Sequence, residues 1–302
     1  MLSGIGPKQH LETFNISVIH SLDVGYNLHD HCCYTELHFC LNQTVTMVRN
    51  KSTADLFDEY ITNHTGPFSI PVRLESIAFL KTPHSDLPVE YPDIEIVLPS
   101  CYLNGENHDV GFQLLGIPQV INDSVIVNYP RNDKFSLVPI ILRPKSRGKI
   151  SLKSSNPFVD PLMEPNYLSN QYDISTLING MKIAIQLAES QNFAEYGATL
   201  DPTPLPACDH LPFRSDQYWR CAIRVMGRNI HHQAGTCKMG PASDSTAVVN
   251  PELQVHGIRN MRVVDTSIMP LPIAGHNNGV MFMIAEKAAD MVKRHWALRG
   301  FK

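Results

Sequence analysis

Residues 229–287 contain the three segments that decide the fold of this chain: N-I-H-H-Q-A-G-T-C-K-M-G (229–240), R-V-V-D-T-S-I-M-P (262–270) and A-G-H-N-N-G-V-M-F-M-I-A-E-K (274–287). A brief β-rich run at 261–264 ends at Asp265, as a buried strand would. The last segment predicts a helix that Asn277 or Asn278 can cap. Its apolar residues share one helical face: Val280, Ile284, Ala288 and Met291. Loops that follow strand ends in α/β sheets are common ligand sites.

Two histidines stand at the turning points of these segments. His232 lies three residues before a turn at Gly235, and His276 directly precedes the predicted helix, whose first N–H groups favour a developing anion. In a strand, His231 and His232 would point to opposite faces, so at most one of them could face a common site. If His232 and His276 converge, protonation of one disfavours protonation of the other, and a neutral base remains at neutral pH. The alternative is that both are structural hydrogen-bonding groups.

The remaining sequence predicts an α+β fold that is mainly an antiparallel sheet with helices packed on it. Its strand candidates occur singly between Pro-rich loops, which favours antiparallel pairing over repeated βαβ units. These candidates are 44–48, 94–98, 125–129, 136–142 and 149–153, with a short additional strand at 16–19. One helix interrupts them, with Asp173 as its expected cap. Its periodic apolar residues are Leu177, Met181, Ile185 and Ala188.

Composition excludes some classes of partner. The 25 basic and 29 acidic side chains nearly balance, so nothing indicates a nucleic-acid or anionic-membrane surface. No apolar run approaches the ~18–20 residues that span a bilayer. Seven cysteines are an odd number, so at least one is unpaired or bonded to another chain. Five N-x-S/T sequons favour a secreted protein: Asn15, Asn42, Asn50, Asn63 and Asn122.

Several ordered motifs extend nearly end to end along the chain. Besides the three C-terminal segments, they are L-S-G-I-G-P (2–7), V-G-Y-N-L-H-D-H (24–31) and R-P-K-S-R-G (143–148). In these motifs the chain resembles the glucose–methanol–choline oxidoreductases, flavin enzymes that oxidise alcohols. It is most similar to their animal glucose-dehydrogenase-like branch. The resemblance implies an FAD cofactor, a small-molecule alcohol or sugar as substrate, and a quinone or other electron acceptor.

The resemblance also implies roles for the two histidines. His232 stands where the family keeps its catalytic base, which takes the hydroxyl proton as hydride passes to the flavin. His276 stands where the family has a second His or an Asn that hydrogen-bonds the same substrate oxygen.

Five further residues match segments that hold the cofactor in the family. Asp265 and Thr266 match a segment along the ribityl and phosphate region. Asn277 and Asn278 match the stretch whose backbone faces the pyrimidine end of the ring, and the helix dipole would suit the negative charge of a reduced flavin there. Asn27 belongs to a segment that covers the bound cofactor.

The resemblance divides the chain into three expected parts. Residues 1–31 would end an FAD-binding region and cover the flavin, 32–225 would bind substrate, and 226–302 would return to the FAD-binding domain. The family's C-terminal homology segment would run from about 142 to 288. Members are about twice this length and begin with G-x-G-x-x-G, whereas here Gly4-Ile5-Gly6 is followed by Gln9. We therefore expect the C-terminal half of such an enzyme.

Two other interpretations stay open from the sequence. The chain could be a non-catalytic binding or interaction module that keeps the substrate sheet without FAD. A dense group of residues could also suggest zinc: His29, His31, Cys32, Cys33, His38 and Cys40. Since they contain no C-x₂-C pair and have no second ligand cluster at finger spacing, we expect no metal site.

Overall fold

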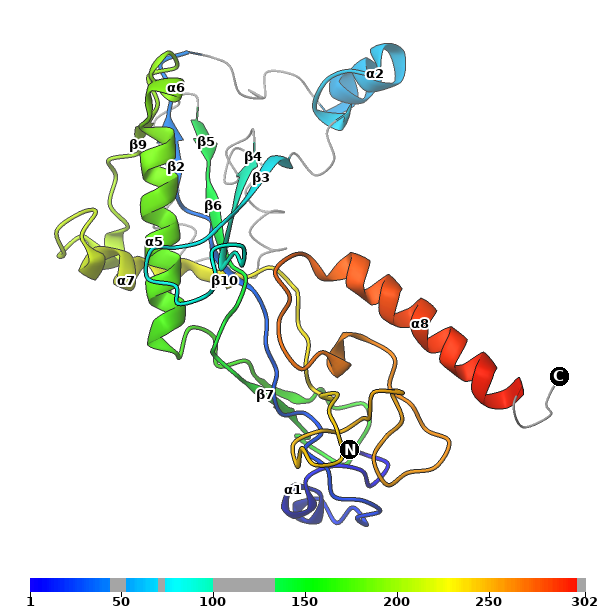
Figure 1. Cartoon of the computed structure of the whole chain (residues 1–302). Coiled ribbons are helices and arrows are strands. Elements are labelled where there is room, and N and C mark those ends of the chain that lie inside the picture. The colour runs from blue at the N-terminus through cyan, green and yellow to red at the C-terminus, as the bar shows by residue number, and fades with distance from the viewer. Residues whose placement is uncertain (44–52, 70–73, 100–133, 298–302) are drawn as a thin grey trace. The chain divides into compact units, whose positions relative to one another are not determined.

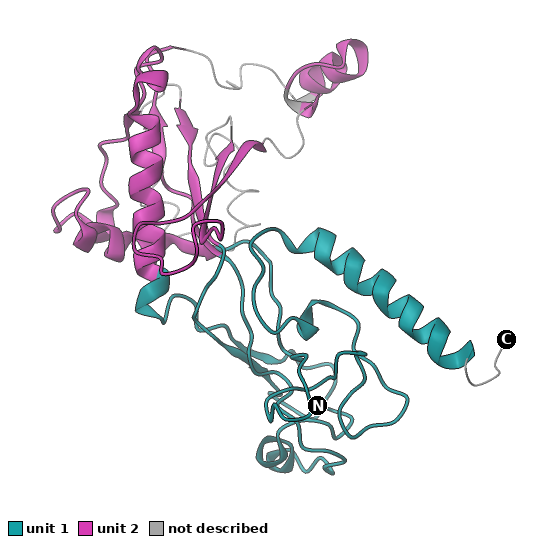
Figure 2. Ribbon diagram, viewed as in Figure 1, with its two compact units in different colours: residues 1–31, 142–173, 229–302 teal, residues 32–141, 174–228 magenta. Residues whose placement is uncertain are grey.

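The structure, a computed structural model, describes residues 1–43, 53–69, 74–99 and 134–297. The chain divides into two compact units, shown in Figure 2. Unit 1 comprises 1–31, 142–173 and 229–302, and unit 2 comprises 32–141 and 174–228. The expected middle part, 32–225, corresponds to unit 2 except for 142–173, which belongs to unit 1.

Unit 2 is built on antiparallel sheet. Among the described residues, one sheet has the strand order β10-β1-β6-β4-β3 and another the order β5-β2-β9. The bounds are β1 Cys32–Tyr34, β2 His38–Cys40, β3 Leu74–Leu80, β4 Ile94–Pro99, β5 Lys134–Ser136, β6 Val138–Ile141, β9 Thr199–Leu200 and β10 Gly227–Asn229. The strands predicted at 94–98 and 136–142 are therefore confirmed, while the candidates at 44–48 and 125–129 lie outside the described residues.

The helix α5, Gln171–Ala188, runs along the strands of unit 2 (Figure 1). Its predicted apolar face is confirmed, because all four periodic residues are buried. A Cβ added at Gly180 would lie 2.7 Å from the Ile94 side chain of β4, so only glycine permits this close packing. Asp173 is not the cap, because α5 begins two residues before it. Its carboxylate instead accepts hydrogen bonds from the backbone N–H groups of Lys145 and Ser146.

The shorter helices of unit 2 are α2 Thr53–Asn63, η1 Pro67–Ser69, α6 Gln191–Ala194, η3 Pro206–Cys208 and α7 Asp216–Met226. A disulfide between Cys208 and Cys221 joins η3 to α7. Cys40 and Cys237 are free. Sequence spacing left this pairing open, because the two cysteines become neighbours only when α7 folds back beside η3.

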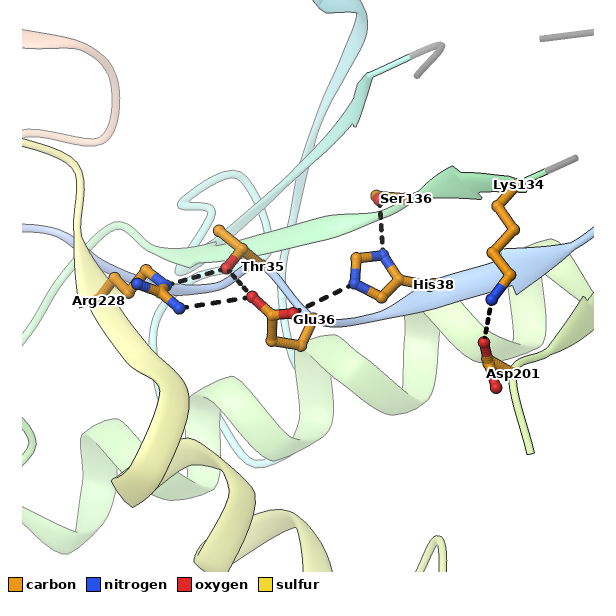
Figure 3. A network of polar contacts seen from close by, with 7 residues as sticks. All are labelled: Thr35, Glu36, His38, Lys134, Ser136, Asp201 and Arg228. Atoms are coloured by element: carbon orange, nitrogen blue, oxygen red, sulfur yellow. Dashed lines mark hydrogen bonds and ion pairs between the residues drawn. The ribbon is translucent and has the colours of Figure 1, made fainter. Parts of the chain in front are cut away.

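A buried polar network lies within unit 2 (Figure 3). Glu36 accepts hydrogen bonds from the Thr35 hydroxyl at 2.9 Å and from His38 Nε2 at 3.3 Å, and pairs with Arg228 at 3.5 Å. His38 Nδ1 lies 2.9 Å from Ser136 Oγ. Burial raises the pKa of Glu36, but the bonds and charges of His38 and Arg228 outweigh it, and the net pKa is lowered. The carboxylate is therefore charged and satisfied inside the unit.

Unit 1 consists largely of loops around its own apolar core. Its regular elements are α1 Lys8–Thr13, β7 Lys149–Ser151, β8 Leu162–Glu164, η4 Thr266–Ile268 and α8 Asn277–Ala297. Ile284 and Ala288 of α8 are buried in that core, and Val280 and Met291 pack against it, which confirms the predicted helical face. The predicted strand at 149–153 is confirmed as β7, which pairs with β8.

Two predicted strands of unit 1 are wrong. Residues 261–264 form only an isolated bridge between Arg262 and Gln254, and Met261 and Val264 are 41% and 40% exposed. No second strand pairs with this run in the described part of the chain, so its β-branched residues cannot build a ladder. Residues 16–19 also form no strand, because this part of the chain pairs only through an isolated parallel bridge between His20 and Ile5.

Candidate active site

The loop that carries His232 is held by the buried carboxylate of Asp30. Asp30 Oδ1 accepts from the His232 backbone N–H at 2.8 Å. Its Oδ2 accepts from the Tyr167 hydroxyl at 2.8 Å and from Asn229 Nδ2 at 2.9 Å. Three separate segments of unit 1 therefore meet at the Asp30 side chain. These bonds fix the position of the His232 backbone, from which the imidazole ring extends.

The strand alternation expected for the two adjacent histidines is wrong. The chain leaves β10 after Asn229, and His231 has a left-handed φ of 60°, so the backbone turns instead of continuing as a strand. His231 is exposed, whereas His232 is half-buried. The outcome that matters for the site is unchanged, because only His232 faces inward. The turn continues at Gly235, whose φ of 94° no L side chain adopts readily.

The predicted convergence of His232 and His276 is confirmed. Their ring centroids are 4.9 Å apart and their planes are nearly perpendicular, at 87°. His276 immediately precedes α8, and the next residue ties the two segments together, since Asn277 Nδ2 donates to the His232 carbonyl at 2.9 Å. Two imidazoles separated by 44 positions, counted from 232 to 276, thus form one cluster at the start of a helix.

A third histidine completes this cluster, which we call the His triad: His31, His232 and His276. The His31 and His232 ring centroids are 5.1 Å apart at 81°. The two Nδ1 atoms of these rings are 2.8 Å apart, and His31 Nε2 lies 3.0 Å from the Ile273 carbonyl oxygen. The sequence did not predict His31 as a partner of His232, because nothing local indicates a contact 201 residues away.

Burial, together with the neighbouring imidazoles, keeps the His232 ring neutral. Burial, followed by the neighbouring imidazoles of His31, His276 and His231, lowers the pKa of His232 from 6.5 to about 4. The ring therefore carries a basic lone pair throughout the neutral range, as a proton acceptor requires. Burial likewise lowers the pKa of His29 to about 4.

The other predicted site residues also lie in unit 1, and most are used to join segments. Asn27 Nδ2 donates to the Gly235 and Pro270 carbonyls, each at 3.3 Å, while its Oδ1 accepts from Arg147 Nε at 3.1 Å. Thr266 donates its hydroxyl to the Gln233 carbonyl at 3.2 Å. Both therefore hold the loop just after His232, at Gln233 and Gly235.

Asp265 and Asn278 leave their polar groups accessible. Asp265 is exposed, and its Oδ1 accepts from Ser267 N at 2.7 Å, which caps η4. Asn278 is exposed in the first turn of α8, and a Cβ added at Gly279 would meet nothing within 4 Å. The first turn of α8 is therefore exposed at Asn278 and Gly279, beside the His triad.

Four of the six residues considered for zinc lie in strands of two different sheets. Cys32 and Cys33 lie in β1, whereas His38 and Cys40 lie in β2 of the other sheet. Within residues 1–43, 53–69, 74–99 and 134–297, no three His, Cys, Asp or Glu side chains are placed to hold a metal ion.

Comparison with known proteins identifies the family. Residues 144–285 match the family model described as GMC oxidoreductase. The chain is 38% identical over 304 residues to the glucose dehydrogenase [FAD, quinone] of Drosophila melanogaster, covering 99% of this chain and 45% of that protein. Residues 144–285 of the chain therefore belong to the GMC oxidoreductase family. The chain is also 35% identical over 300 residues to the alcohol dehydrogenase [acceptor] of Pseudomonas putida, covering 97% of this chain and 48% of that protein.

Solved structures share the fold of this chain. An Aspergillus oryzae formate oxidase superposes with a TM-score of 0.77 at 24% identity, covering 97% of this chain and 51% of that one. The chain thus spans about half the length of the relatives it matches. Among the described residues, no helix is long and apolar enough to cross a membrane.

Proposed function

We propose that this chain takes part in FAD-dependent oxidation of a CH–OH group in an alcohol or sugar. The observation that carries the proposal is the pair of imidazole rings 4.9 Å apart, one of them neutral and half-buried, at the start of α8. Such oxidation requires a base for the hydroxyl proton close to a site where negative charge can be stabilised. The names of the GMC relatives, a glucose dehydrogenase and an alcohol dehydrogenase, favour the same chemistry.

His232 acts as the base in this proposal. Its ring accepts the hydroxyl proton of the substrate, while the hydrogen on the adjacent carbon leaves as hydride and the carbonyl product forms. With a pKa of about 4, the ring is unprotonated before the reaction at neutral pH. The proton added to it resides on an imidazole whose position the Asp30 carboxylate fixes through the His232 backbone N–H.

His276 orients the substrate oxygen. Its ring is exposed and stands edge-to-face with His232, so one oxygen can contact both imidazoles. A hydrogen bond from His276 to that oxygen keeps the hydroxyl group in line with the base, which raises the rate by positioning.

The open first turn of α8 fits a flavin. Asn277 and Asn278 provide the backbone N–H groups of that turn, where the helix dipole favours an anion. Asp265 and Thr266, at η4, and Asn27 would hold the rest of the cofactor. FAD, when bound, supplies the acceptor for the hydride. Electrons then pass to a quinone or another acceptor.

A secreted location is part of the proposal. The disulfide between Cys208 and Cys221 suits an oxidising compartment. Three of the sequon asparagines are exposed, namely Asn15, Asn42 and Asn63, and so are accessible to glycosylation.

The visible absorption spectrum of the purified, FAD-reconstituted chain tests the proposed function. We expect flavin absorption near one equivalent and bleaching of that absorption when an alcohol or sugar is added without oxygen. A folded protein that remains colourless after reconstitution would contradict the proposal and favour the non-catalytic binding module.

A further inference from the structure

His31 is the member of the His triad that the proposed mechanism does not use. Its side chain is buried, with 2% exposure, at the end of the 24–31 segment. Both of its ring nitrogens face groups of unit 1. Nε2 lies 3.0 Å from the Ile273 carbonyl oxygen, and Nδ1 lies 2.8 Å from His232 Nδ1.

The positions of the hydrogen atoms in these contacts follow from whether each partner can donate or accept a hydrogen bond. A carbonyl oxygen only accepts, so His31 Nε2 must carry the hydrogen that it donates to Ile273. A neutral imidazole has a single N–H, and His31 Nδ1 is then a lone pair. Two facing nitrogens at 2.8 Å need one hydrogen between them, and that hydrogen belongs to His232 Nδ1. The Nε2 atom of His232 is left with the basic lone pair.

We propose that His31 is a positioning residue, which holds His232 in the Nδ1–H tautomer so that its Nε2 atom is the base. This inference rests on the proposed function for the use of that base, but the tautomer itself is a property of the chain. In the reverse tautomer, Nε2 would carry the hydrogen and could not accept the substrate proton.

The same contact remains useful after proton transfer. When the substrate O–H bond breaks, the new N–H bond forms at His232 Nε2 and the ring becomes an imidazolium. Its Nδ1–H continues to donate to His31 Nδ1, so the added charge has a hydrogen-bond acceptor on its far side. The Ile273 carbonyl continues to hold the His31 tautomer. The chain of hydrogen bonds therefore needs no rearrangement during the step.

Asp30 and His31 hold different parts of His232. Asp30 fixes the His232 backbone N–H, while His31 fixes the His232 side chain. A merely structural histidine would be replaceable by any side chain of similar size. A tautomer-setting histidine needs an acceptor at the position of its Nδ1 atom, and that difference separates the two roles.

The test compares His31→Asn with His31→Leu. The Asn carbonyl oxygen can stand near the former Nδ1 position and accept from His232, whereas Leu has similar bulk and no acceptor. Long-range ¹H–¹⁵N spectra of ¹⁵N-histidine-labelled full chain at neutral pH report which nitrogen of His232 is protonated, and a His232→Gln spectrum assigns its signals. Thermal unfolding of each variant checks that it is folded.

We expect His232 to be protonated at Nδ1 in the wild-type chain and in His31→Asn, and to lose this single tautomer in His31→Leu. A wild-type His232 protonated at Nε2, or an unchanged tautomer in His31→Leu, would overturn the inference. In FAD-loaded protein, His31→Leu should slow flavin reduction about 10–100-fold, the usual effect of losing a partner that orients a histidine, with little change in substrate affinity. His31→Asn should recover most of the rate, and equal rates for both variants would count against the role.

The two proposals fail separately. If the wild-type chain binds FAD but does not oxidise alcohols, the proposed function fails while the tautomer measurement still decides the role of His31.

Discussion

Replacing Asp30 with Ala would show how strongly the loop that carries His232 is held. The Asp30 side chain is only 3% exposed. It accepts three hydrogen bonds of 2.8–2.9 Å, from the His232 backbone, the Tyr167 hydroxyl and the Asn229 amide. Truncation leaves all three donors without this acceptor.

The expected cost follows from these contacts. Each hydrogen bond to a charged group contributes about 1.5–3 kcal/mol. The three do not add in full, because removing the carboxylate also removes the cost of burying its charge. We expect Asp30→Ala to lower the free energy of unfolding by about 3–5 kcal/mol, which is less than the full sum of the three hydrogen bonds.

Urea unfolding followed by fluorescence measures this change, and hydrogen exchange of the His232 amide reports the loop directly. For slopes near 1–3 kcal/mol per molar urea, the midpoint should fall by about 1 M or more. Asp30→Asn is the matched control, because it keeps the volume and one acceptor oxygen, and it should lose less. An Asp30→Ala chain that unfolds at the wild-type midpoint, with an equally protected His232 amide, would refute the reasoning.

Three further predictions concern stability and protonation. Replacing Cys208 and Cys221 with Ser should cost about 3 kcal/mol, because the disulfide closes a loop of 13 positions; an unchanged Tm in calorimetry would contradict this. Since folding lowers the pKa of Glu36, its contribution is complete above the unfolded value near 4.5 and is lost as pH falls through the folded value. Glu36→Gln should flatten that acid limb of the unfolding free energy, and an identical pH dependence would count against the network. Finally, NMR titration should show the His232 ring neutral down to about pH 4; a midpoint near 6.5 would show that the ring is not desolvated.

Helical periodicity was predictable in this chain because the two long helices each bury one continuous face. The apolar spacings of α5 and α8 correspond directly to buried residues such as Met181 and Ile284. Strand predictions succeeded where a partner strand lies in the same unit, as for β4. They failed at 261–264, where β-branched residues form no ladder among the described residues. Whether a predicted strand forms depends on a pairing partner, and the local sequence does not contain that information.

The candidate site was predictable only in part, for the same reason. The meeting of His232 and His276 was expected from the ordered motifs of the family, and the two rings are neighbours in the structure. His31 was missed because its contacts with His232 and Ile273 join positions more than 200 residues apart. The local pattern H-D-H could have indicated a positioning role, since it places an acceptor carboxylate beside a histidine. Nothing in it specifies what the two side chains hold.

The rate of flavin reduction in His232→Ala tests the central claim most directly. Stopped-flow measurement on FAD-loaded protein should show that this step is about 10²–10⁴-fold slower than in the wild type, as expected for the loss of a general base. His231→Asn is the control, because His231 is exposed and Asn tolerates its left-handed backbone at φ 60°. We predict that this neighbouring variant retains the wild-type rate. Equal rates for His232→Ala and the wild type would contradict the account.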